Sequence, residues 1–304
     1  MKPRVLFIAG AVLLAAAGLL AFFLRHGPPK QVTPPPVTTT APATTTKPAP
    51  TTTAPPPAPP PSRVAMSWSN AGAIVWHTHD VDPNWLGQQL RSAGFGWAAV
   101  YLGSAGNVEP IDGGWVTRFV LASGLPVGGW TTLGGDAEAD AGFAATQLKL
   151  TGLSFYIADA EYAYQQTPGA SQSFVARFRT LEPTMTAGLS SLCDARGIGL
   201  EPWAAGGFAF LPQAYVNDFG SAVTPAACVR AAVGYFPLSA IHPTVGSYHG
   251  QLEGFVPVQQ YTRLLARAGT TGFSVYPAET QMDAESWQAY GQAIASLHIA
   301  TRVR

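Results

Sequence analysis

The sequence has few cysteines: Cys193 and Cys228 are the only two among 304 residues. This scarcity excludes a small protein held together by many disulfides. The two residues form no C-x-x-C pair and no Cys/His cluster of the kind that binds structural zinc. Two interpretations stay open, one disulfide in an oxidising compartment or two buried free thiols, and the 34 residues between the cysteines do not discriminate between them.

Charged residues are also scarce, at 11% of the chain. The first 62 residues hold five of the 17 basic residues and none of the 17 acidic ones, so residues 63–304 carry 12 positive against 17 negative charges. The arginines of this acidic part are scattered and form no stripe that would follow a phosphate backbone. We therefore expect no nucleic-acid partner.

The first 62 residues do not have the composition of a folded domain. Residues 5–24 contain no charge, and as a helix they would span roughly 30 Å, the thickness of a bilayer core. A cleaved signal peptide usually has a shorter apolar region and a small-x-small cleavage site, and no such site follows Leu24. The sequence predicts an uncleaved signal anchor over residues 1–26, with the membrane as partner through residues 5–24; a cleaved signal peptide is the alternative.

Residues 27–62 contain 14 prolines and 10 threonines. Proline fixes φ and removes hydrogen-bond donors, so this stretch predicts a disordered, semi-rigid linker that reaches up to ~110 Å at about 3.1 Å per residue. Threonine runs interleaved with proline also suit O-glycosylation. Together the two segments predict a single-pass membrane protein whose C-terminal domain, residues 63–304, lies outside the membrane.

In residues 63–304, apolar runs of strand length alternate with amphipathic stretches of helix length, which is typical of a parallel sheet covered by helices. Eight such units in about 240 residues favour a closed (β/α)8 TIM-type barrel over an open sheet, because closure removes both edge strands. The predicted strands cover residues 73–79, 97–102, 126–131, 154–160, 185–191, 208–215, 242–248 and 272–277. The predicted helices cover 83–93, 115–123, 137–151, 171–182, 201–205, 225–234, 257–268 and 283–297.

The fourth predicted strand carries the strongest candidate for chemistry. Alternation places Phe155, Ile157, Asp159 and Glu161 on one face, and the active groups of such barrels lie at the carboxyl ends of the strands. Two carboxylates in a partly desolvated mouth repel each other, which separates their pKa values and leaves one protonated and one ionised near neutral pH. Such a pair supplies a general acid and a charge that stabilises an oxocarbenium or oxazolinium-like species.

This Asp159-Ala160-Glu161 motif resembles the Asp-x-Glu at the end of strand four in (β/α)8 glycoside hydrolases. The layout is similar to family 25 lysozymes and, more distantly, to the chitinase-type family 18 enzymes, which place an aromatic-Asp motif on strand six where this chain has residues 212–215. The family 18 pattern also has further Asp residues upstream, at positions occupied here by Ser154 and Ile157. The resemblance implies Glu161 as proton donor and Asp159 as nucleophile or as the group that orients a substrate acetamide.

The remaining candidates are expected to bind substrate. Tyr215 and Gln213 lie at the sixth strand, where the resemblance implies hydrogen bonds to the same sugar. Aromatic rings near strand ends suit the apolar faces of sugars. The predicted substrate-binding residues are Tyr215, Gln213, Trp130, Tyr248, Tyr276, Tyr101, His79 and Asp80.

The sequence therefore predicts a membrane-tethered glycosidase that needs no cofactor or metal and acts on cell-envelope polysaccharide, with peptidoglycan as a candidate. A first alternative is an inactive barrel that binds wall polysaccharide as a surface tether. A second rests on His77 and His79, whose H-x-H resembles the metal-binding start of amidohydrolase barrels. Those enzymes also have His on strands five and six, where this chain has residues 189–191 and 213–215.

Overall fold

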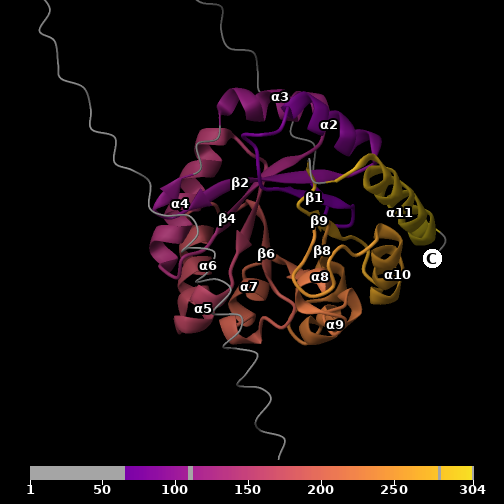
Figure 1. Ribbon diagram of the computed structural model, residues 1–304. Helices are drawn as coiled ribbons and strands as arrows, with labels where there is room; N and C mark the ends of the chain where they lie inside the picture. The colour runs from indigo at the N-terminus through magenta and orange to yellow at the C-terminus, as the bar shows by residue number, and fades with distance from the viewer. Residues whose placement is uncertain (1–65, 109–111, 280–281, 303–304) are drawn as a thin grey trace, which may run out of the picture. The chain divides into compact units, whose positions relative to one another are not determined.

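The structure is a computed structural model that describes residues 66–108, 112–279 and 282–302. Eight parallel strands close into a barrel because β1 pairs with both β2 and β9, which confirms the predicted (β/α)8 class. Figure 1 shows the strands at the centre and the helices around them. The barrel strands are β1 (Gly72–Val75), β2 (Trp97–Ser104), β4 (Val127–Thr132), β5 (Phe155–Asp159), β6 (Thr186–Leu192), β7 (Ala209–Gln213), β8 (Thr244–Gly246) and β9 (Ser274–Tyr276).

All eight predicted strands are present, with shifted ends. The largest shift is at β1, which ends at Val75 rather than at residue 79. A short strand that the sequence did not predict, β3 (Asn107–Val108), pairs antiparallel with the end of β2.

Several helices on the outside of the barrel are capped at their ends by Asp or Gly. Asp82, Asp112 and Asp136 each accept backbone N–H groups at a helix start, and Gly124 and Gly152 end helices in the left-handed conformation. The predicted helices are α2 (Pro83–Ser92), α3 (Gly113–Ser123), α4 (Ala137–Thr151), α6 (Ala170–Leu181), α7 (Glu201–Ala205), α9 (Pro225–Ala232), α10 (Val258–Ala268) and α11 (Ala284–Arg302). Unpredicted short turns are α5 (Tyr162–Gln166), α8 (Val216–Phe219), and the 3₁₀ turns Arg196–Ile198 and Leu238–Ala240.

The apolar core has two layers, and strand alternation decides which residues enter each. In β5, Tyr156 and Ala158 pack outward between strands and helices, whereas Phe155 and Ile157 point into the barrel. The barrel interior also contains Ile74, Trp97, Ala99, Tyr101, Trp130, Ala209 and Leu211. Each inward row ends at the mouth, so the next inward residue of β5, Asp159, emerges there.

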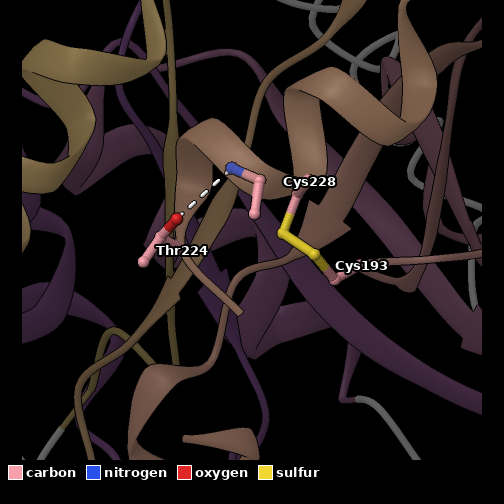
Figure 2. The surroundings of a disulfide bond; sticks show 4 residues. Cys193, Thr224 and Cys228 are labelled. Atoms are coloured by element: carbon pink, nitrogen blue, oxygen red, sulfur yellow. Dashed lines mark hydrogen bonds between the residues drawn. A yellow bond between two sulfur atoms is a disulfide. The ribbon is translucent and has the colours of Figure 1, made fainter. Parts of the chain in front are cut away.

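The two cysteines form a disulfide (Figure 2). Cys193 directly follows β6, and Cys228 lies in α9, whose first turn is capped by the Thr224 hydroxyl. The bond therefore joins the loop after β6 to the helix after β7, across the stretch 192–240 that is richest in short elements. The structure therefore confirms the first of the two interpretations, a disulfide between the two cysteines.

None of the helices in the part of the chain that the structure describes is long and apolar enough to cross a membrane. The predicted anchor (residues 1–26) and linker (residues 27–62) lie outside the described residues. Membrane attachment and export of the barrel therefore stay predictions.

Candidate functional site

The two predicted catalytic carboxylates open into one cavity of about 220 Å³ at the mouth of the barrel. Asp159 is the last residue of β5, and Glu161 immediately precedes α5. Between them, the Ala160 N–H donates to the Ser190 carbonyl of β6, so the pairing with β6 extends one residue beyond Asp159. The cavity is lined by Ile74, Trp76, Trp130, Thr132, Ile157, Asp159, Glu161, Ser190, Gln213, Tyr215 and Tyr276.

A single amide group connects the two carboxylates. Gln213 Nε2 donates to Asp159 Oδ1 at 3.0 Å and to Glu161 Oε1 at 2.6 Å, and lies 3.3 Å from Ser190 Oγ. These side chains come from three neighbouring parallel strands, β5, β6 and β7, whose carboxyl ends meet at the mouth. The amide holds both acids toward the same side of the cavity.

The electrostatics of this pair are asymmetric. Burial and then the charge of Glu161 raise the pKa of Asp159 well above its ordinary value, against hydrogen bonds from Ser190 and Gln213 that lower it. Asp159 therefore keeps a proton to a higher pH than an ordinary aspartate. Burial also raises the pKa of the Tyr215 hydroxyl, which stays a neutral hydrogen-bonding group beside the pair.

Four aromatic side chains line the cavity: Trp76, Trp130, Tyr215 and Tyr276. Tyr215 and Tyr276 are stacked, with ring centroids 5.8 Å apart. Trp130 is fixed by a hydrogen bond of 2.9 Å from Nε1 to the Val75 carbonyl. Flat rings of fixed orientation beside two carboxylates can bind the apolar faces of a sugar while the acids reach its polar atoms.

The structure brings together six of the ten predicted site residues. Asp159, Glu161, Gln213, Tyr215, Trp130 and Tyr276 line the cavity, and the other four do not.

Each of those four has a local reason for its position. Tyr101 is buried behind Trp76, with which it stacks at 4.8 Å and 9°. Tyr248 donates its hydroxyl to Asp218 and lines a separate cavity of about 240 Å³. Because β1 ends at Val75, His79 and Asp80 follow it as exposed loop residues instead of strand-end residues.

Several residues of the site were not predicted from the sequence. Ser190 and Thr132 line the cavity from the ends of β6 and β4, and Ile74 lines it from β1. A further carboxylate, Glu279, follows β9 and is fully buried. Glu279 follows an apolar strand, as Asp159 does, so the same sequence pattern indicates it.

Both histidines of the H-x-H segment are exposed to solvent, and His77 Nδ1 lies 2.5 Å from Glu279 Oε1. Within residues 66–108, 112–279 and 282–302, no three His, Cys, Asp or Glu side chains gather as a metal site would require.

No protein-family model matches the sequence, and no curated protein matches it. Solved structures do match the fold. A domain of a thermostable chitinase from Pyrococcus furiosus, crystallised with chito-oligosaccharides, has a TM-score of 0.58 at 10% identity over 79% of this chain and 98% of its own. A chitinase from Chromobacterium violaceum has a TM-score of 0.54 at 16% identity over 74% of this chain and 99% of its own.

A family 18 chitinase from Flavobacterium johnsoniae gives a TM-score of 0.55 at 10% identity, over 76% of this chain and 96% of that chain. All three matches cover nearly the whole of the compared chain, so the shared feature is the complete barrel. The domain thus has the (β/α)8 fold found in glycoside hydrolases of family 18.

Proposed function

We propose that the protein is a glycosidase that cleaves an N-acetylated polysaccharide of the cell envelope. The observation that carries this proposal is the pair Asp159 and Glu161, bridged by Gln213 in one aromatic-lined cavity. The similarity of the barrel to family 18 chitinases supports the same class of substrate. The predicted anchor and linker support a location outside the membrane, where envelope polysaccharide lies.

The chemistry follows from the position of each acid. Glu161 donates a proton to the glycosidic oxygen as the bond between that oxygen and the anomeric carbon breaks, so the leaving sugar departs as a neutral alcohol. The anomeric carbon becomes electron-poor, and the acetamide oxygen of an N-acetylated sugar can attack it, which is the substrate-assisted route. Water then completes hydrolysis and returns the proton to Glu161.

Asp159 fits the orienting role better than the nucleophilic one. A nucleophilic carboxylate must be ionised, whereas burial and the charge of Glu161 raise the pKa of Asp159. An orienting carboxyl group can instead start with a proton. When that proton passes to Glu161, Glu161 becomes the acid that protonates the glycosidic oxygen, and the ionised Asp159 accepts the acetamide N–H and stabilises the positive charge that develops there. The aromatic wall formed by Trp130, Tyr215 and Tyr276 would hold the ring of the same sugar.

The test is release of reducing ends from chitin and from peptidoglycan by the full-length chain and by Glu161→Gln. We expect the wild type to release ends from at least one polymer and the variant to lose about two orders of magnitude or more in rate. Glu201→Gln, which alters an exposed glutamate of α7, serves as the control and should retain the wild-type rate. Equal rates for Glu161→Gln and wild type would remove Glu161 from the mechanism.

The second candidate function is binding of wall polysaccharide without cleavage. Ile157 favours it, because this apolar side chain lines the cavity at a position where the family 18 pattern has an aspartate. Saturable binding of insoluble chitin or peptidoglycan, combined with no release of reducing ends by wild type, would support this alternative.

A further inference from the structure

Glu279 is a buried carboxylate with a complete set of partners. It is 0% exposed, and its Oε2 accepts the backbone N–H groups of Trp76 at 3.1 Å and His77 at 2.7 Å. Its Oε1 lies 2.5 Å from His77 Nδ1. Burying a carboxylate is costly unless it is paired and hydrogen-bonded, and here all three donors come from the two residues that follow β1.

These contacts cross the seam at which the barrel closes. Strands β1 and β9 share only two registered pairs, Gly72 with Ser274 and Ala73 with Val275. Beyond them, Ala278 N donates to the Ile74 carbonyl at 2.9 Å. Glu279 adds the last contacts of the seam at the mouth, where the strand pairing itself has ended.

The two chain segments that Glu279 joins each carry one ring of the cavity wall. Trp76 supplies one of the backbone donors, and Tyr276 lies three residues before the carboxylate. Both rings line the cavity, with centroids 6.1 Å apart. A shift of either segment would change the spacing of these rings.

We propose that Glu279 is a positioning residue which, together with His77, sets the spacing of Trp76 and Tyr276 and thereby the affinity of the cavity for a sugar ring. This inference rests on the proposed function for its ligand. A site whose rings are fixed before binding loses less freedom when the ligand enters. Glu279 does not line the cavity itself and acts through the segments it connects.

Two measurements on the full-length chain test the proposal. The first is the Kd for tetra-N-acetylchitotetraose by calorimetry, with Glu161→Gln added to every chain compared, wild type included, so that the ligand is not cleaved. The second needs no ligand: the ¹⁹F spectrum of chain labelled with 5-fluorotryptophan, in which loss of one line in Trp76→Phe assigns Trp76. Glu279→Gln removes an acceptor from the seam. His77→Ala keeps the carboxylate and both backbone donors, and it provides the answer if Glu279→Gln does not fold.

We expect both variants to weaken binding, Glu279→Gln by about tenfold, and both to shift or broaden the Trp76 line. His77→Asn, which restores a side-chain donor, should recover part of the affinity lost in His77→Ala. Ser274→Ala is the matched control, because Ser274 is buried in β9 and hydrogen-bonds Thr244 away from the cavity. It should lower Tm while leaving the Kd and the Trp76 line unchanged.

Unchanged Kd and ¹⁹F spectra in Glu279→Gln and His77→Ala would overturn the inference. So would equal effects of Ser274→Ala, because these would reflect general destabilisation. If the wild type binds no saccharide, the proposed function fails, and the proposed effect on affinity fails with it. The Trp76 line then still decides whether Glu279 positions the wall.

Discussion

Asp140 and Asp159 are two acids of one barrel with opposite surroundings. Asp140, in α4, is 1% exposed and accepts backbone N–H groups from Gly134 and Gly135 and the hydroxyl of Tyr164. Asp159 opens into the cavity, where its neighbour is another acid. Asp140 therefore receives its hydrogen bonds from the protein itself and holds the loop after β4 in place.

The pKa directions express the same difference. Burial, with a smaller contribution from the charge of Asp136, raises the pKa of Asp140, and hydrogen bonds from Gly134, Tyr164 and Gly135 offset part of this rise. Burial and the charge of Glu161 raise the pKa of Asp159 well above its ordinary value, although hydrogen bonds from Ser190 and Gln213 lower it. A buried acid that accepts hydrogen bonds from several protein donors, such as Asp140, is therefore structural. An acid that faces a like charge in a cavity, such as Asp159, can still hydrogen-bond a ligand.

The largest effect is expected at Asp140, the acid whose hydrogen-bond donors all come from the protein. Asp140→Ala leaves two backbone N–H groups and the Tyr164 hydroxyl without their acceptor. We expect a loss of about 2–4 kcal/mol in the free energy of unfolding, measured in urea, because unsatisfied buried donors carry a desolvation penalty. A loss no greater than that of an exposed-site substitution would show that the loop does not depend on this carboxylate.

The bridging amide offers the next test. Gln213→Leu removes one of the two hydrogen bonds that lower the pKa of Asp159, the other coming from Ser190. That pKa should therefore rise further, and the pH–rate profile of hydrolysis should move to higher pH. We expect kcat to fall by about tenfold at neutral pH. The same change at Gln172, an exposed residue of α6, should leave the profile in place. An unshifted profile in Gln213→Leu would separate the amide from the titration of the pair.

A smaller and opposite effect is expected from Asp159→Asn. The pKa of Asp159 is higher in the folded state than in the unfolded state, so between these two pKa values the folded chain binds more protons. The free energy of unfolding is therefore greatest below the unfolded-state pKa, and it declines as the pH rises through the folded-state pKa. The variant lacks this penalty. It should be more stable than wild type at pH 7, by on the order of 1 kcal/mol, and the difference should shrink as the pH falls toward 4.

Equal stability of Asp159→Asn and wild type across this pH range would show that Asp159 is not strained by its surroundings. Thermal unfolding followed at several pH values between acid and neutral gives the comparison directly.

The smallest effect is expected at an exposed acid. Asp194 forms a surface ion pair with Arg196, whose hydrogen bond lowers the pKa of the aspartate. Exposed pairs of this kind contribute little, because water screens them and both side chains lose freedom. Asp194→Asn should leave the Tm of the protein unchanged within experimental error. A clear decrease in Tm would show that this ion pair stabilises the fold, as Asp140 does.

The sequence allowed prediction of the barrel and of the Asp159 and Glu161 pair because both depend on local patterns. The alternation of β5 alone determines that Phe155, Ile157 and Asp159 share the inward face. The ends of the strands were harder to predict, and β1 ends four residues before its predicted end. This boundary separates the exposed His79 from the cavity.

Contacts between distant parts of the chain were not predictable from one sequence. The hydrogen bond from Trp76 N to Glu279 joins residues 203 positions apart, and it forms only when the last strand closes onto the first. Trp76 and Tyr101 form a stack in which only Trp76 lines the cavity, and the sequence does not indicate which of the two rings does so. Composition and alternation carry no information on either arrangement.

The most direct test follows a single sample of tetra-N-acetylchitotetraose mixed with the Glu161→Gln chain, with binding measured by calorimetry and cleavage by mass spectrometry. If the cavity at the end of β5 binds the sugar and Glu161 donates the proton, the variant binds saturably and leaves the tetrasaccharide intact over the time in which wild type cleaves it. Cleavage at the wild-type rate, or no saturable binding by either chain, would contradict the assignment.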